Sequence, residues 1–291
     1  MTLQDIILIG LQASVAMTVF VLGMVREIRE ATFMFRNPGV LGRSLLAMDV
    51  VMPLFAVLAI ALTSVPAPVK IALAALSVSP VPPLLPRKTQ TVGGTHEYAI
   101  GLLFAAAIIA PVFVPLAVGL LGVLHGVHAN ISFLAVATIM LMTVLGPLVA
   151  GVVIRNNWPE LAERLVKPLG TIAIVLLVLC AVPVIVKLWP QMMLLVGDGT
   201  LLVFAAFVIV GLAVGHYMSR PDPEERTVLA VATSSRHPGV AMAIATASFP
   251  EQKLVSAAII LYLLVCAVIS LPYLSWRRRH DTSVPHAPVA I

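Results

Sequence analysis

The sequence predicts an all-α, polytopic membrane protein with about nine transmembrane helices arranged as an inverted repeat. Three observations support this fold class. Of the 291 residues, 60% are hydrophobic and only 11% are charged, a composition far from that of a soluble domain. Apolar runs of about 20 residues, long enough for the hydrocarbon core of a bilayer, recur along the chain. Two of these runs are interrupted at corresponding positions of the two halves.

The first three segments cover residues 5–25, 43–63 and 68–86. The first is a continuous apolar run that ends at the charged stretch "REIRE", and the second carries Asp49, the only acidic residue well inside a span. The third contains Pro80, Pro82, Pro83 and Pro86. Each proline removes a backbone donor and clashes with the preceding turn, so this segment is expected to be a broken helix.

The remaining six segments cover residues 96–121, 131–154, 168–187, 199–218, 227–248 and 252–275. Five of them are expected to be continuous helices. The segment 227–248 is interrupted at "SSRHPG", where Pro238 disfavours α geometry in the residue before it and Gly239 relaxes the chain. The sequence therefore predicts a second broken helix.

The two broken segments occupy equivalent places in two groups of three. Segments 43–63, 68–86 and 96–121 are offset by five spans from segments 199–218, 227–248 and 252–275. Because five is odd, the two groups lie in the membrane in opposite orientations. Paired broken helices in inverted halves are typical of secondary transporters, which bind their substrate near the midplane between the breaks. Simple proline kinking of transmembrane helices is the alternative.

Lys and Arg gather on one side of these segments. Three fall on the other side (Lys70, Lys187 and Lys253) and Arg236 lies within a segment. Because short cytoplasmic loops are enriched in Lys and Arg, the sequence predicts a multi-pass protein of a plasma or bacterial inner membrane, with its N-terminus outside and its C-terminus in the cytoplasm. The cytoplasmic set is Arg26, Arg29, Arg36, Arg43, Arg87, Lys88, Arg155, Arg164, Lys167, Arg220, Arg226, Arg277, Arg278 and Arg279.

The composition also argues against several functions. The net charge of +5 is explained by these cytoplasmic loops, so no nucleic-acid partner is predicted. The two cysteines, Cys180 and Cys266, lie inside apolar runs and are expected to be packing residues. The chain has no H-E-x-x-H motif, no nucleophile elbow and no acidic cluster, so no enzyme activity, metal or cofactor is predicted.

Three stretches resemble the bile acid:sodium symporter family, part of the wider bile/arsenite/riboflavin transporter superfamily. "FMFRNPGVLGRSLLAMDVVMPLFAVLAIAL" is similar to an arginine-rich turn followed by a helix that ends in Q-F-x-x-M-P. "ALSVSPVPPLLPRKTQTVGGTHEYAIGLLFAAAIIAPVFVPL" aligns with the segment that begins C-P-G-G-x-x-S-N. "ATSSRHPGVAMAIATASFPEQ" lies where the family has E-T-G-x-Q-N.

The resemblance implies a six-helix core with crossing broken helices and a separate panel domain. The panel would comprise residues 1–40, with the first helix and an inner loop, and residues 126–190. The core repeats would be 41–125 and 191–279, followed by a cytoplasmic tail at 280–291.

The chain departs from this family at the residues that hold sodium. The motif glutamate falls on Ala232, the glutamines on Arg236 and Met48, and the asparagine on His237, whereas Thr233 is retained. Hard cations need oxygen ligands, and a guanidinium, which stays protonated in proteins, is incompatible with sodium in the same place. The earlier serine and asparagine also change, to Leu85 and Pro86.

Arg236 and Asp49 are the charged residues predicted to lie deep in the membrane. Arg236 is nine residues into its segment, about 14 Å of helix, and a charge there needs a partner or a water-filled cavity. We expect the two residues to approach each other, with Arg236 as a built-in substitute for the missing cation. Three roles for Arg236 remain open: a static pair with Asp49, snorkelling to the cytoplasm, and binding of an anionic substrate. His237 is expected to make a helix-end hydrogen bond, and it or Asp49 is a candidate proton carrier.

The sequence thus predicts a secondary transporter that moves a small organic anion by alternating access and is proton-coupled or uncoupled. The predicted binding residues are Arg236, His237, Asp49, Thr233, Ser234 and Ser235. One alternative is a sodium symporter with displaced ligands at Thr233, Ser234, Ser235 and Asp49. Another is a non-transporting receptor or scaffold of the same fold.

Overall fold

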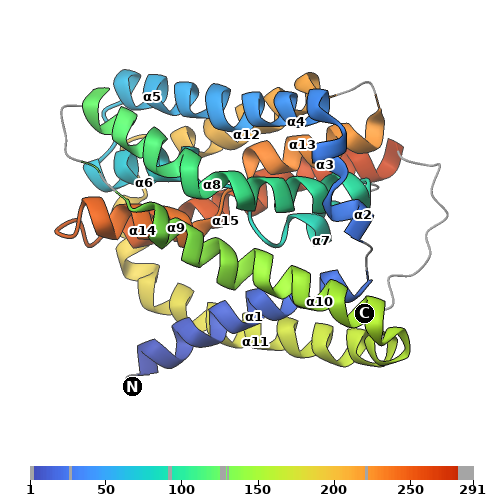
Figure 1. Ribbon diagram of the computed structural model, residues 1–291. Helices are drawn as coiled ribbons and strands as arrows, with labels where there is room; N and C mark the ends of the chain where they lie inside the picture. The colour runs from blue at the N-terminus through green and yellow to red at the C-terminus, as the bar shows by residue number, and fades with distance from the viewer. Residues whose placement is uncertain are drawn as a thin grey trace.

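The computed structural model describes residues 3–25, 28–90, 94–124, 129, 131–219 and 222–280, and all regular elements within them are helices. The predicted cytoplasmic tail, except for His280, lies outside the described residues. Figure 1 shows most helices running along one common direction, with α1, α10 and α11 on one side of the bundle. The predicted all-helical, polytopic membrane fold is confirmed.

Six helical stretches of the described chain are long and apolar enough to cross a membrane. Two of them combine several elements: Pro38–Leu62 consists of α4 (Pro38–Leu45), the π-helix η1 (Leu46–Val51) and α5 (Met52–Leu62), and Phe133–Asn157 consists of α9 (Phe133–Met140), the π-helix η2 (Leu141–Leu145) and α10 (Gly146–Asn157). The other four are α8 (His96–Leu124), α11 (Pro159–Leu195), α12 (Thr200–Met218) and Val255–Arg279, which is α15 (Val255–His280) without its last residue.

The other three predicted segments are present as α1 and two broken helices. α1 (Leu3–Val25) contains the shorter apolar helix Ile9–Val25. The segment 68–86 becomes α6 (Ala67–Ser77) and α7 (Leu85–Gln90), and the segment 227–248 becomes α13 (Pro223–Ser234) and α14 (Pro238–Ser248). Two short helices, α2 (Ile28–Ala31) and α3 (Phe33–Arg36), connect α1 to α4.

The two broken helices meet at their breaks. The backbone N–H of His237 donates a hydrogen bond of 2.9 Å to the carbonyl of Pro80. On the two sides of this bond, α6 packs against α14 and α7 packs against α13. The proline-rich break and the Arg-His-Pro break therefore form one crossing in the bundle.

α1 packs against α10 and α11, away from the crossing (Figure 1). Gly23 and Gly151 allow the backbones of α1 and α10 to touch, since Cβ atoms there would meet the carbonyls of Leu148 and Phe20. α11 is longer than its predicted segment 168–187 and continues through Pro168, Pro183 and Pro190 to Leu195, so the predicted domain boundary at residue 190 falls inside this helix. The division into core and panel stays a prediction.

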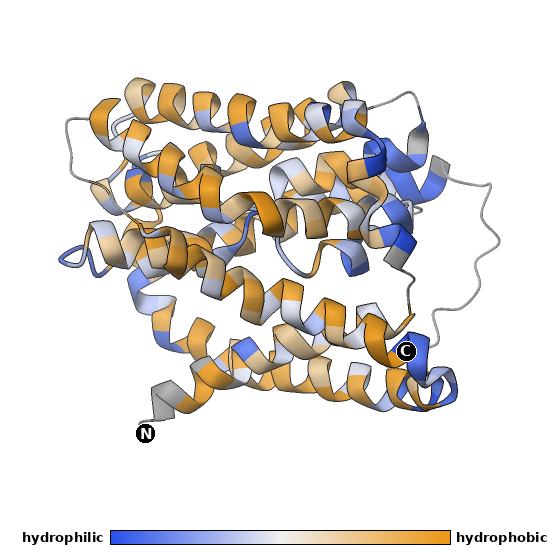
Figure 2. Ribbon diagram, in the orientation of Figure 1, coloured by the Kyte–Doolittle hydropathy of each residue, from blue (hydrophilic) through white to orange (hydrophobic). Residues whose placement is uncertain are grey.

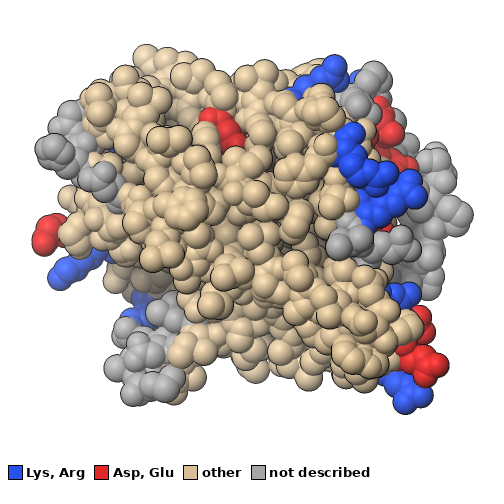
Figure 3. Space-filling view, in the orientation of Figure 1, with Lys and Arg blue, Asp and Glu red and all other residues tan. Residues whose placement is uncertain are grey.

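Charged side chains lie mainly at the two ends of the bundle. Figure 3 shows a broad surface between them that is uncharged except for one acidic side chain, with most of the visible Lys and Arg side chains at one end. The ribbon coloured by hydropathy has the same band of apolar helices (Figure 2). Exposed leucines such as Leu54, Leu58 and Leu62 on α5 follow the four-residue helical repeat, which is the pattern of a lipid-facing stripe.

Candidate functional site

The side chain of Arg236 lies at the crossing and is almost completely buried, with 1% of its surface exposed. Its Nη2 donates a hydrogen bond of 3.0 Å to the carbonyl of Met48, and its Nη1 donates one of 3.3 Å to the carbonyl of Ser79. The guanidinium carbon also lies 5.9 Å from the centre of the Phe207 ring, within the range of a cation–π contact. Arg236 therefore connects both broken helices to the helix run that contains η1.

The local structure explains why the Met48 carbonyl is free to accept this bond. Met48 lies in η1, where hydrogen bonds join residues five apart, and the residue five positions later is Pro53. Proline has no backbone N–H, so the Met48 carbonyl lacks the donor that a π-helix would supply. Arg236 provides that donor from the opposite half of the chain.

The Ser79 carbonyl is free for a different reason. α6 ends at Ser77, and Ser79 lies in the irregular break that follows it. The last carbonyls of a helix have no intrahelical donors and carry a partial negative charge. Arg236 itself lies two residues after the end of α13, which is at Ser234. Its guanidinium thus lies near the carboxyl ends of two half-helices, a position that favours a cation.

Tyr262 of α15 satisfies a further carbonyl at the break. Its hydroxyl donates a hydrogen bond to the carbonyl of Ser234, and the Cys266 thiol lies 3.5 Å from the same oxygen. Edge-to-face contacts of the Tyr262 ring with Phe204 and Phe207 hold it in place. Sequence reasoning missed these aromatic residues, because nothing in the apolar pattern of α12 and α15 distinguishes them from packing residues.

His237 is the N-cap of α14. Its Nδ1 accepts a hydrogen bond of 3.4 Å from the N–H of Val240, which is the helix-end contact expected from the sequence. Within the described structure, His237 Nε2 and Arg236 Nε are buried and have no hydrogen-bond partner. Two polar nitrogens at the crossing are therefore left for water or a ligand.

Asp49 is half-buried and lies next to Met48, so the structure brings it close to Arg236 as expected. Its charge acts on Arg236 through space, but the two described side chains form no ion pair within 4.0 Å. The direct partners of Arg236 are backbone carbonyls and not this carboxylate. Arg236 also does not reach the solvent, so the alternative of a snorkelling side chain does not describe this conformation.

Thr233, Ser234 and Ser235 lie together and buried at the end of α13. The hydroxyls of Thr233 and Ser234 donate to the carbonyls of Leu229 and Val231 in their own helix. Ser235 contacts the sulfur of Cys266 at 3.9 Å. In this conformation each of the three hydroxyls has a different partner, and the described residues contain no group of three His, Cys, Asp or Glu side chains suited to a metal.

Two glycines of α12 allow α13 to pack closely against it next to the break. Cβ atoms on Gly211 and Gly215 would meet the backbone of α13, at 2.8 Å from Ser234 Cα and 2.5 Å from Ala230 Cα. The spacing G-x-x-x-G is the usual pattern for close contact of transmembrane helices. This pattern is readable in the sequence as "GLAVG".

Comparison with known proteins identifies the family of this chain. The sequence model of the sodium bile acid symporter family matches residues 13–194, which is more than half of the chain. The matched range extends from α1 to the end of α11 and stops before the break that contains Arg236. No curated protein matches the chain. By the extent of the family match, this chain belongs to the sodium bile acid symporter family, whose members are membrane transporters.

Proposed function

We propose that this protein carries a small organic anion across the membrane by alternating access, without using the usual sodium sites of its family. The observation that carries this proposal is the pair of hydrogen bonds from Arg236 to the carbonyls of Met48 and Ser79. In transporters with broken helices, unwound carbonyls and half-helix carboxyl ends coordinate the coupling cation. Here a guanidinium that cannot leave takes that position.

The electrostatics of the crossing support an anionic substrate. The hydrogen bonds of Arg236 go to neutral carbonyls, and the nearby Asp49 carboxylate makes no direct contact with the guanidinium. A charge deep in the membrane is expensive unless it is compensated. A substrate anion that reaches the crossing when the helices move apart would supply this compensation, and the unpartnered Nε of Arg236 offers it a donor.

The distribution of charge supports an orientation with the C-terminus in the cytoplasm. α15 ends with Arg277, Arg278 and Arg279, and positively charged residues are favoured on the cytoplasmic side. This site is also compatible with proton coupling, in which Asp49 or His237 would carry the proton.

The test is uptake into proteoliposomes of three labelled anions: a bile salt, benzoate and succinate. We expect uptake of at least one of them that is equal in sodium chloride and choline chloride, and is reduced at least tenfold in Arg236→Gln. Repeating the assay with a pH gradient separates proton-coupled from uncoupled transport. A strict requirement for sodium would contradict the proposal, and no uptake above protein-free vesicles would favour a receptor or scaffold.

A further inference from the structure

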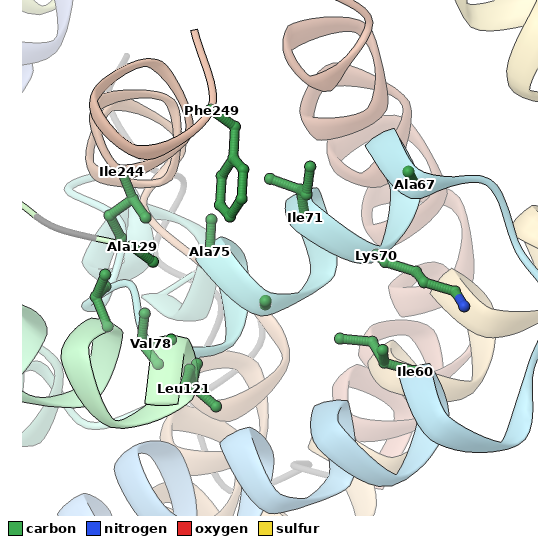
Figure 4. A pocket seen from close by; sticks show the side chains of 13 residues that line it. Ile60, Ala67, Lys70, Ile71, Ala75, Val78, Leu121, Ala129, Ile244 and Phe249 are labelled. Atoms are coloured by element: carbon green, nitrogen blue, oxygen red, sulfur yellow. The ribbon is translucent and has the colours of Figure 1, made fainter. Parts of the chain in front are cut away.

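A cavity of about 260 Å³ lies beside the crossing, between α5, α6, α8 and α14. Its lining is apolar except for Lys70, and includes Ile60, Leu121 and Phe249. Figure 4 shows Phe249 extending toward Ala75 of α6, with Leu121 of α8 near Val78. Side chains from four helices of both halves of the chain thus line the cavity, which remains partly open to the surroundings.

The cavity runs along α6 for the depth of one membrane leaflet. Its lining begins at Ala67, the first residue of α6, and ends at Val78, directly after this helix. Eleven residues of helix correspond to about 16 Å, and half of the hydrocarbon core of a bilayer is about 15 Å. The lining residue Ile60 lies near the end of α5 at Leu62, and Leu121 near the end of α8 at Leu124. The cavity therefore extends from the ends of the membrane helices toward the middle of the bundle.

Lys70 supplies one positive charge near the outer end of this cavity. It lies one turn from the start of α6, and Figure 4 shows its side chain at the edge of the group that lines the cavity. Within the described residues, its ammonium has no hydrogen bond or ion pair. An occupant that is hydrocarbon along its length and negatively charged at one end matches this arrangement.

The lining favours a lipid over a water-soluble ligand. Sites for soluble ligands place several convergent polar groups around the ligand to fix its orientation. Here a single ammonium is the polar group among thirteen lining residues. Two helices that line the cavity, α5 and α8, also carry exposed leucines: Leu58 and Leu62, and Leu120 and Leu124. These leucines place the surrounding bilayer next to the cavity.

We propose that this cavity holds one acyl chain of an anionic phospholipid, with the lipid phosphate at Lys70. The chain would contact both half-helices, through Ala75 of α6 and Ile244 of α14. Its inner end would reach Val78, the residue before the carbonyl that accepts the hydrogen bond of Arg236. A lipid at this position is independent of which solute the protein carries.

Native mass spectrometry of the delipidated protein tests this site, with phosphatidylglycerol and phosphatidylcholine of identical acyl chains as probes. A basic side chain near a phosphate contributes enough attraction to favour the anionic lipid by about fivefold. We expect this preference for one tightly bound lipid in the wild type and in Lys70→Arg, and its loss in Lys70→Gln. Lys187→Gln is the matched control, since Lys187 is an exposed lysine of α11 that does not line the cavity.

Ala74→Leu tests the acyl-chain part of the proposal, because it adds side-chain volume at a lining position. We expect this variant to lose both phospholipids, with a melting temperature at least equal to that of the wild type without lipid. Retained preference for phosphatidylglycerol in Lys70→Gln, or retained lipid in Ala74→Leu, would overturn the site. An equal loss of the preference for phosphatidylglycerol in Lys187→Gln would show a general charge effect and would overturn the proposal. Binding of dodecanoate by a protein that does not bind phosphatidylglycerol would show that the occupant is a soluble amphiphile, which would also overturn it.

Discussion

The Nη2 atom of Arg236 lies 3.0 Å from the carbonyl oxygen of Met48, a residue 188 positions earlier in the chain. The hydrogen bond joins the second broken helix to the π-helix η1 of the opposite half. Together with the bond to Ser79 it fixes three segments around one guanidinium. Because Pro53 offers no N–H to the Met48 carbonyl and Ser79 lies outside a helix, Arg236 supplies these buried carbonyls with a donor.

Replacing Arg236 with an apolar side chain of similar length should destabilise the protein. Arg236→Met removes two hydrogen bonds from a charged donor, each with a net contribution of about 1.5–3 kcal/mol, so we expect a loss of about 3 kcal/mol or more. Arg236→Lys keeps the charge without the planar guanidinium, so its free energy of unfolding should lie between those of Arg236→Met and the wild type. Denaturant unfolding in detergent measures the change, with the exposed Arg278→Met as the control. Equal stability of Arg236→Met and wild type would contradict the bridging role.

Asp49 and Arg236 should show only weak energetic coupling. A direct ion pair at 4 Å would be worth about 4 kcal/mol at an effective dielectric constant of 20. The structure contains no such pair within 4.0 Å, so a double-mutant cycle of Asp49→Asn and Arg236→Met should give a coupling below about 1.5 kcal/mol. A coupling near 4 kcal/mol would show that the two side chains pair directly.

Gly215 should not tolerate a methyl group. A Cβ atom there would lie 2.5 Å from Ala230 Cα, and overpacking of this kind costs about 1–3 kcal/mol. Gly119→Ala is the matched control, because Gly119 also lies in a membrane helix and has nothing within 4 Å of its Cβ position. We expect a lower melting temperature for Gly215→Ala and an unchanged or slightly higher one for Gly119→Ala. The same result for both glycines would argue against close packing of α12 on α13.

The hydroxyl of Tyr262 should contribute to stability through the Ser234 carbonyl. Tyr262→Phe keeps the ring contacts with Phe204 and Phe207 but leaves this buried acceptor with the weak thiol donor of Cys266 alone. The expected loss of unfolding free energy is about 1–3 kcal/mol. Tyr217→Phe should change it by less than about 0.5 kcal/mol, since Tyr217 is 84% exposed. Equal effects of the two substitutions would contradict a stabilising role for the hydrogen bond from Tyr262 to the Ser234 carbonyl.

The sequence predicted the two breaks and their meeting better than it predicted the contacts at the crossing. Prolines and glycine mark the interruptions directly, because their backbone effects are local. The sequence also indicated that Arg236 would lie near Asp49. It did not indicate that backbone carbonyls would accept the hydrogen bonds, because a free carbonyl depends on helix geometry and not on a side chain. Pro53 was the available signal, since a missing N–H leaves an earlier carbonyl without its donor.

Other parts of the site were not readable from one sequence. Tyr262 and Phe207 are aromatic residues among many apolar ones, and only the packed structure shows that one caps a carbonyl and the other faces a guanidinium. The small-residue contact at Gly211 and Gly215 was readable, because G-x-x-x-G has a physical meaning in membrane helices.

The central claim is that Arg236 occupies the place of a coupling cation, and the melting temperature in sodium chloride against choline chloride at equal ionic strength tests it most directly. A sodium site at ten times its Kd would raise the unfolding free energy by about 1.4 kcal/mol. We predict no sodium-specific rise for the wild type. If only Arg236→Gln shows a sodium-specific rise in melting temperature, the carbonyls of Met48 and Ser79 accept sodium once the guanidinium is removed. A sodium-specific rise in the wild type would contradict the claim, because it would show that sodium binds while the guanidinium is in place.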